Sequence, residues 1–115
     1  MDGEKLYDMA FLNKVSGGDE SFIREMIDTF KEVGPEYLEK ADKMLMENNI
    51  EALGKETHRI IPGVTFLGAK ALEYDLMLIE EYTKKSINLE EIPKLLNNCR
   101  NMISRLLEVF DQDFS

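Results

Sequence analysis

The stretch NLEEIPKLLNNCRNMISRLLEVF (residues 88–110) carries the most regular apolar pattern in the chain. Its apolar side chains recur at intervals of three and four residues, which places them on one face of an α-helix. They are Ile92, Leu95, Leu96, Cys99, Met102, Ile103, Leu106 and Phe110. Asn88 precedes the pattern and Glu91 follows three residues later, which is typical of a helix N-terminus with a capping box. The stretch predicts a long amphipathic helix whose apolar face must be covered by other helices.

Two segments near the N-terminus show the same helical spacing. A short helix is expected at about residues 6–15, closed by the SGG sequence at 16–18. Asp19 is then expected to be the N-cap of a helix over about residues 20–47. Gly34 and Pro35 lie inside that helix, so we expect a kink there or two abutting helices.

The middle of the chain predicts two more helices. The third helix begins near Ile50, and its C-terminal end stays open because Pro62 and Gly63 lie within the pattern. The fourth covers about residues 69–85 and is apolar on more than one side, so we expect it to pack on two sides or to be partly covered by the N-terminal helix. These segments predict an all-α fold: an antiparallel four-helix bundle with a short additional N-terminal helix.

A single domain over residues 1–115 is expected, with the N-terminal cap helix at about 6–15 and the bundle at about 19–112. Of the 115 residues, 43% are hydrophobic and 32% are charged, which is enough apolar material for one core. The 14 Lys and Arg residues against 23 Asp and Glu residues give a net charge of −9. This acidic balance argues against nucleic acid or an anionic membrane as the main partner.

The counts of cysteine and histidine exclude further classes of site. One Cys and one His leave no intrachain disulfide, no Cys/His metal site and no catalysis by several histidines. The chain shows no apolar run long enough to span a bilayer and no secretory signal pattern. A lone cysteine also fits a reducing compartment, so we expect a cytoplasmic protein.

Few side chains other than the histidine offer chemistry. Cys99 lies on the apolar face of the last helix and is expected to be a buried structural thiol. The acidic residues are expected to be solvated, and Glu80 and Glu81 have no His beside them to indicate a metal site. Tyr74 and Tyr82 are expected to be packed aromatic side chains.

His58, the only histidine, is distinguished by its position. The apolar face of the third helix is formed by Leu53, Thr57, Ile60 and Val64. On a helical wheel His58 points about 120° from the centre of that face, so its side chain is expected to project towards solvent. An ordinary exposed histidine is the simpler interpretation of position alone. An exposed imidazole nevertheless offers a neutral nitrogen nucleophile, and Lys55 and Arg59 could offset the charge of a phosphoryl group.

The stretch ETHRIIPGVTFLGAKAL (residues 56–72) resembles the signature of histidine-containing phosphotransfer (HPt) domains. In that signature Leu-Gly-Ala begins nine residues after the histidine and a Leu follows, and this chain has Leu67, Gly68, Ala69 and Leu72 there. The N-terminal part is similar too, at Tyr7-Asp8, Phe11-Leu12, Ser16-Gly17-Gly18-Asp19, Phe22-Ile23, Met26-Ile27 and the segment from Phe30 through Pro35 to Leu38. The resemblance covers nearly the whole chain and implies a four-helix bundle.

The resemblance implies that His58 is the phosphoacceptor of a phosphorelay in bacterial two-component signalling. His58 would take a phosphoryl group from a receiver-domain phosphoaspartate and pass it to another receiver aspartate. The implied partners are receiver domains of response regulators or hybrid histidine kinases. No metal and no cofactor is expected on this domain, because Mg²⁺ belongs to the receiver. The chain has no glycine-rich phosphate loop, so no ATP site and no autokinase activity are expected.

The implied role places this chain in the cytoplasm, either alone or as a domain of a membrane-anchored hybrid kinase. The small residues Gly68 and Ala69 are expected at the passage between two helices, where they permit close packing beside the histidine helix. Leu67 and Gly63 are the other structural positions that the signature implies.

The chain departs from the signature directly after the histidine. The family has a Lys three residues after the histidine and a Gly four residues after it, whereas this chain has Ile61 and Pro62, with Gly63 displaced by one. A side chain at either position leans back towards the histidine, so Ile61 removes a cation from the phosphoryl group. Pro62 has no N–H, so the carbonyl group of His58 loses its helical partner.

The face around His58 is the expected docking surface for receivers. Its expected contacts are Gly54, Lys55, Arg59, Ile61, Pro62 and Thr65. Ile61 is expected to be an apolar anchor in that interface. Gly54 lacks a side chain and is expected to let the partner approach closely. We therefore expect Gly54→Arg to block docking without harming the fold.

Two other classes of function stay open. One is an adaptor that binds receivers without carrying phosphate, an interpretation favoured by the missing Lys. The other is a structural or oligomerising bundle, for which the strongly apolar segment 71–79 is the indication. An enzyme with its own active site is the least favoured, because a single histidine without a paired base leaves little catalytic machinery.

Overall fold

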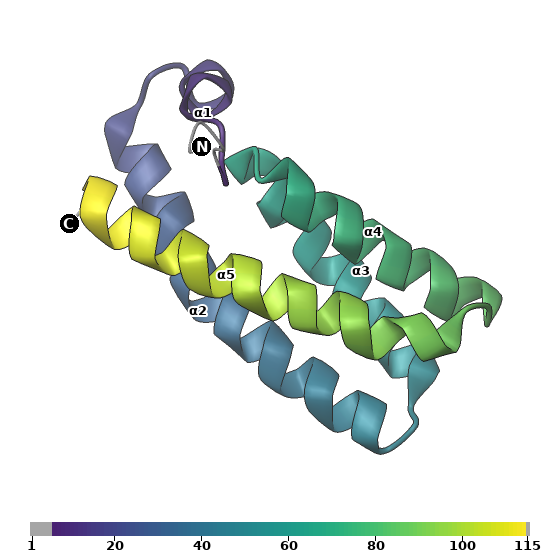
Figure 1. The fold of residues 1–115 in the computed structure, drawn as a ribbon. Coiled ribbons are helices and arrows are strands. Elements are labelled where there is room, and N and C mark those ends of the chain that lie inside the picture. The colour runs from purple at the N-terminus through teal and green to yellow at the C-terminus, as the bar shows by residue number, and fades with distance from the viewer. Residues whose placement is uncertain (1–5, 115) are drawn as a thin grey trace.

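The computed structural model describes residues 6–114, and four long helices of that range form an antiparallel bundle (Figure 1). In chain order the elements are α1 (Met9–Ser16), α2 (Glu20–Met46), α3 (Ile50–Leu67), α4 (Lys70–Lys85), a short 3₁₀ turn η1 (Leu89–Glu91) and α5 (Ile92–Phe114). The short helix α1 lies at one end of the bundle, against α2 and α3. The all-α architecture predicted from the sequence is confirmed.

Local sequence explains where the helices begin. Asp19 accepts a hydrogen bond from the backbone N–H of Phe22 (3.2 Å), so its predicted role as the N-cap of α2 is confirmed. Asn49 caps α3 in the same way by accepting from Ala52 N–H (3.3 Å). These caps satisfy backbone donors that have no partner within the first helical turn.

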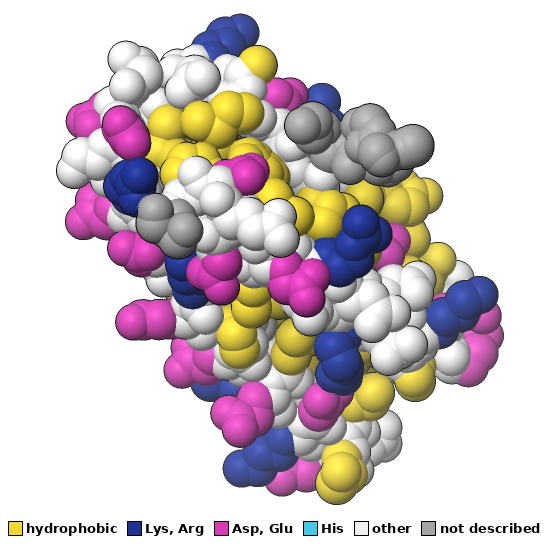
Figure 2. All heavy atoms as spheres, turned by 60° about the vertical axis from the view of Figure 1, so that its left-hand side comes forward, with side chains coloured by type: hydrophobic (Ala, Val, Ile, Leu, Met, Phe, Trp, Pro, Cys, Tyr) yellow, Lys and Arg dark blue, Asp and Glu magenta, His cyan; other side chains and the backbone are white. Residues whose placement is uncertain are grey.

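The core lies where the apolar faces of α2 to α5 meet. The face of α5 contributes the buried residues Ile92, Leu96, Cys99, Ile103, Leu106 and Phe110. Cys99 is fully buried, and burial raises the pKa of its thiol to about 12, so it is the structural cysteine expected from the sequence. On the outside, Figure 2 shows basic and acidic side chains interspersed over one face of the molecule, with hydrophobic side chains reaching the surface between them.

Both internal prolines lie within continuous helices. α2 passes through Gly34 and Pro35 as one helix, so the alternative of two abutting helices is wrong. Gly34 is buried, and a Cβ there would lie only 3.2 Å from Ile103 of α5, so this position holds α2 tightly against the bundle. Pro35 is exposed, where a carbonyl without a helical N–H partner can bond to water. α3 likewise runs through Pro62 as far as Leu67.

Two expectations about α4 and α5 are corrected. α4 packs against two helices, α3 and α5, but Met77 is 52% exposed and Tyr74 is 65% exposed, so the expectation that Tyr74 is a packed aromatic side chain is wrong. The helix α1, which packs on α2 and α3, leaves this face of α4 open to solvent. Asn88 does not cap α5: it has a left-handed backbone (φ 50°) that an N-cap does not adopt, it makes no side-chain cap hydrogen bond, and η1 intervenes.

The turn from α3 to α4 is held against the segment before α1. Gly68 has a left-handed backbone (φ 71°), and a Cβ there would lie 2.8 Å from the Cβ atom of Asp8. Leu67 and Ala69 on either side are buried. Gly68 is therefore needed both for its conformation and for this close approach, which extends the predicted packing role of Gly68 and Ala69 to the N-terminal segment.

Candidate functional site

Two neighbouring residues on α3 point in different directions. Thr57 is fully buried, and its hydroxyl group lies 2.8 Å from the phenol oxygen of Tyr37 in α2. The side chain of His58 is 75% exposed. The helical wheel therefore placed the histidine correctly on the solvent-facing flank of the helix, because the direction of a side chain follows from the helical period once the apolar face is buried.

The imidazole of His58 is held by a carboxylate from the neighbouring helix. His58 Nδ1 lies 2.5 Å from Glu80 Oε2 of α4, and the Glu80 side chain is 27% exposed. An ionised carboxylate only accepts hydrogen bonds, so Nδ1 is the donor. The other ring nitrogen, Nε2, then carries a lone pair if the ring is neutral, and it is the atom available to a partner.

Glu80 was missed in the sequence, where it was interpreted as a solvated residue with no histidine beside it. The missing signal is the register of the α3–α4 hairpin. His58 and Glu80 each lie eleven residues from Ala69 in the turn, on opposite sides of it. In an antiparallel helix pair, residues at equal distances from a tight turn lie at the same height along the two helix axes. The hydrogen bond between Thr65 and Glu73 follows the same rule.

Gly54 lies one turn before His58 and faces α4 as well as the site. A Cβ at Gly54 would lie 2.6 Å from Thr83 Oγ1, and Thr83 is nearly buried. The absence of a side chain therefore allows α3 and α4 to approach each other. The expectation that Gly54→Arg leaves the fold unharmed is wrong, because the larger side chain would clash with Thr83.

A groove of about 850 Å³ surrounds the imidazole between α3 and α4. It is lined by Ile50, Glu51, Gly54, Lys55, His58, Arg59, Glu80, Thr83, Lys84 and Ser86. Three of the lining residues are cations and two are acids, so the positive charges outnumber the negative ones locally in a chain of net charge −9. Such a surrounding favours the arrival of an anion at the imidazole.

The two cations predicted beside His58 are each paired within α3. Lys55 Nζ lies 3.9 Å from Glu51 Oε2, and Arg59 Nη1 lies 3.6 Å from Glu56 Oε2. Both side chains are about three-quarters exposed, so these pairs are weak. Both partners lie towards the N-terminus of α3, which is the direction in which helical side chains lean.

The other residues of the predicted docking surface have mixed surroundings. Pro62 and Thr65 are exposed, and the Thr65 hydroxyl lies 2.7 Å from Glu73 Oε2. Ile61 is half-buried and packs against the core, so much of its side chain is already covered within the chain. Gly63 is exposed, and a Cβ there would meet nothing within 4 Å, so no contact of this fold requires a glycine at that position.

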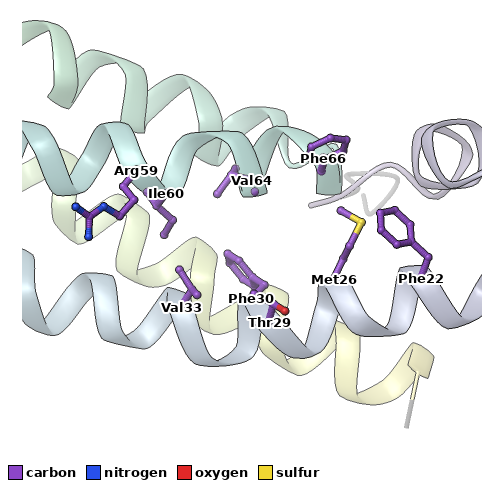
Figure 3. Close-up of a pocket in the computed structure, with 10 residues that line it drawn as sticks. Phe22, Met26, Thr29, Phe30, Val33, Arg59, Ile60, Val64 and Phe66 are labelled. Carbon is purple, nitrogen blue, oxygen red and sulfur yellow. The ribbon is translucent and has the colours of Figure 1, made fainter.

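A second groove, of about 390 Å³, lies on the other side of α3 against α2 (Figure 3). Phe22, Met26 and Phe30 of α2 line it, together with Ile60, Val64 and Phe66 of α3. Most of its lining residues are apolar, whereas most of the residues that line the His58 groove are polar or charged. Arg59 borders both grooves, so α3 separates two surfaces of different character.

Residues 6–114 were searched for metal-binding groups and for membrane-spanning helices. No group of three or more His, Cys, Asp or Glu side chains within residues 6–114 is placed to hold a metal ion. None of the helices in that range is both long enough and apolar enough to cross a membrane.

Comparison with known proteins supports the fold alone. No protein-family model matches the chain, and no curated protein sequence matches it. Among solved structures, it is similar to the histidine-containing phosphotransfer protein B (HptB) from Pseudomonas aeruginosa PAO1, with a TM-score of 0.86 and 21% sequence identity. The similarity covers 94% of this chain and 93% of that protein. The chain therefore has the fold of a histidine-containing phosphotransfer protein.

Proposed function

We propose that this chain carries a phosphoryl group on His58 between receiver domains. It accepts the group from a receiver phosphoaspartate and passes it to the aspartate of another receiver. The observation that carries the proposal is the exposed imidazole of His58, whose Nδ1 donates to Glu80 and so leaves Nε2 for a partner, on a bundle with the fold of a phosphotransfer protein. A transfer of this kind needs a fixed and accessible nucleophile more than it needs a closed active site.

The chemistry starts at His58 Nε2. The nitrogen lone pair attacks the phosphorus atom of the acyl phosphate, a P–N bond forms as the P–O bond breaks, and the receiver carboxylate leaves. The reverse reaction delivers the group to the next aspartate. No additional base is required, because the neutral imidazole has no proton on Nε2 to lose.

Glu80 positions the ring and faces the charge that develops on it. When Nε2 gains the phosphoryl group, the imidazole acquires positive charge, and its Nδ1–H points at the Glu80 carboxylate. The hydrogen bond also fixes which nitrogen is the nucleophile, so the phosphoryl group is expected on Nε2. Glu80 is thus a positioning residue for the transfer.

The partner supplies the rest of the transition-state stabilisation. A receiver's bound Mg²⁺ offsets phosphoryl charge during transfer, and this chain contributes the nucleophile and its orientation. We expect no cofactor on this chain and no autophosphorylation from ATP. We further expect the partner receivers to meet it in the cytoplasm and to dock over the His58 groove, with Lys55 and Arg59 at the rim of the contact.

Incubation with phosphorylated receivers tests the proposal. We expect radioactive phosphate to move to this chain, and the label to be acid-labile and stable to base, as a phosphoramidate is. His58→Gln should lose all label, while its free energy of unfolding stays within about 0.5 kcal/mol of the wild-type value because the side chain is exposed.

Two results would argue for other functions. Label persisting in folded His58→Gln would remove His58 as the acceptor. Receiver binding by the wild-type chain without any transfer would favour the adaptor, an alternative supported by the Ile61 and Pro62 departures from the family signature. A parallel incubation with ATP alone should leave the chain unlabelled.

A further inference from the structure

The proposed phosphoryl site on His58 lacks the cation that the family signature places three residues after the histidine. Ile61 stands where the resemblance implies a Lys, and its side chain packs against the core. Lys55 and Arg59 lie on α3 but lean away from His58, towards Glu51 and Glu56. A phosphoryl group on Nε2 carries close to two negative charges at neutral pH, so the origin of compensating charge is open.

Lys84 of α4 lines the same groove as His58. It follows Glu80 by four residues, so the two share one face of α4, about 6 Å apart along the helix axis. Helical side chains lean towards the N-terminus of their own helix, so the Lys84 side chain leans towards Glu80, which bonds the imidazole. Its four-carbon stem is long enough to span that turn.

Lys84 differs from the other cations near the site in how it is paired. It directly follows Thr83, the residue on which Gly54 of α3 packs closely. Within residues 6–114, no carboxylate oxygen lies within 4 Å of the Lys84 amino group, in contrast to Lys55 and Arg59. The next residue, Lys85, pairs with Glu81 (3.4 Å) and does not line the groove.

We propose that Lys84 supplies from α4 the positive charge that stabilises a phosphoryl group on His58. The inference rests on the proposed phosphoacceptor role of His58 and names the residue that tunes it. Lys84 thereby replaces, from the opposite helix, the cation that Ile61 removes from α3. Glu80 and Lys84 then have opposite roles one turn apart: the carboxylate orients the ring, and the ammonium group meets the phosphate.

A matched set of variants tests the role of Lys84. Lys84→Gln removes the charge, Lys84→Arg keeps it, and Lys85→Gln removes the same charge one residue away. We expect Lys84→Gln to slow transfer from a phosphorylated receiver roughly two- to fivefold, the range for one partly exposed ion pair. Lys85→Gln should transfer at the wild-type rate, and Lys84→Arg should restore most of the loss.

A second measurement separates an effect on the phosphoryl group from an effect on receiver docking. The phosphorylated chain is purified away from the receiver, and its phosphorus resonance is followed by NMR as a function of pH. A nearby cation favours the more ionised phosphoryl group, so the midpoint should rise by roughly 0.2–0.7 of a pH unit in Lys84→Gln. High salt should shrink this difference.

The outcomes distinguish a failure of the proposed phosphoacceptor function from a failure of the role of Lys84 alone. A wild-type chain that takes no label overturns the proposed function, and the role of Lys84 with it. A labelled wild-type chain whose Lys84→Gln and Lys85→Gln variants behave alike, in rate and in titration midpoint, overturns only the role of Lys84. A slower rate with an unchanged midpoint also overturns it, because Lys84 would then act on docking.

Discussion

Thr57 and His58 are neighbours on α3, and each makes a hydrogen bond to another helix, Thr57 to α2 and His58 to α4. Thr57 reaches Tyr37 of α2 inside the core, where its side chain is fully buried. His58 reaches Glu80 of α4 in a groove open to water. The two contacts have the same form, a polar pair joining two helices, but they differ in how much solvent can replace them.

Access to water determines how much each hydrogen bond contributes to the stability of the fold. The Thr57 hydroxyl donates its only proton to the Leu53 carbonyl oxygen (2.8 Å), so the Tyr37 phenol donates to Thr57. Burial raises the pKa of Tyr37, which keeps the phenol protonated as that donor. If Thr57 is lost, no water can reach this donor easily, whereas the groove around His58 offers water freely. The inner pair therefore stabilises the fold, and the outer pair orients a reactive nitrogen.

The largest effect on stability is expected for Thr57→Val, which keeps the shape of the side chain but leaves the Tyr37 hydroxyl without its partner. The free energy of unfolding should fall by about 1–3 kcal/mol, the cost of an unsatisfied buried donor. Urea denaturation measures the loss, and Thr57→Ser, which keeps the hydroxyl, is the control. Phosphotransfer by the folded Thr57→Val chain should continue. If Thr57→Val were as stable as the wild type, the Thr57–Tyr37 hydrogen bond would not stabilise the fold more than the exposed His58–Glu80 pair does.

Glu80→Ala is expected to show the reverse behaviour, with unfolding nearly unchanged and transfer impaired. Loss of the hydrogen bond frees the imidazole to rotate and to change tautomer, so the transfer rate should fall by about fivefold, corresponding to about 1 kcal/mol. Glu81→Ala, which removes an acid on the same helix that pairs with Lys85, is the control. Nitrogen NMR of the imidazole in the wild-type chain should show the proton on Nδ1. Equal rates for the two variants would mean that Glu80 does not position the ring.

The smallest effect is expected for Ile61→Lys, which restores a cation on α3. The phosphohistidine half-life should lengthen modestly, by the ~0.2–1 kcal/mol of an exposed ion pair. Stability should fall slightly, because Ile61 packs partly against the core and the lysine stem recovers only part of that contact. A shorter half-life would count against the electrostatic account, and unchanged receiver affinity would count against Ile61 as a docking anchor. Chemical quench and binding titration measure the two quantities separately.

Predictions made from the sequence were correct where a feature depends on residues close together in the chain. The apolar period of residues 92–110 places one face of α5 in the core, and the Asp19 cap of α2 is a short-range contact. Expectations failed where the outcome depends on packing. Gly34 and Pro35 do not divide α2, because the helix is held against α5 at Gly34, and the apolar side chains of α4 are not all covered, because α1 packs elsewhere.

The sequence by itself determined the helices, the outward direction of His58 and, through the resemblance around residues 56–72, the fold and the candidate phosphoacceptor. These depend on the helical period and on motif spacing within one segment. Only the tertiary structure decided that Glu80 bonds the imidazole, that Lys84 lines its groove and that Gly54 faces Thr83. Those contacts join residues twenty or more positions apart, so they exist only once the Gly68 turn sets the register of α4 against α3. The direction of a side chain follows from the period of its own helix, whereas its contacts across a groove depend on how two helices pack against each other.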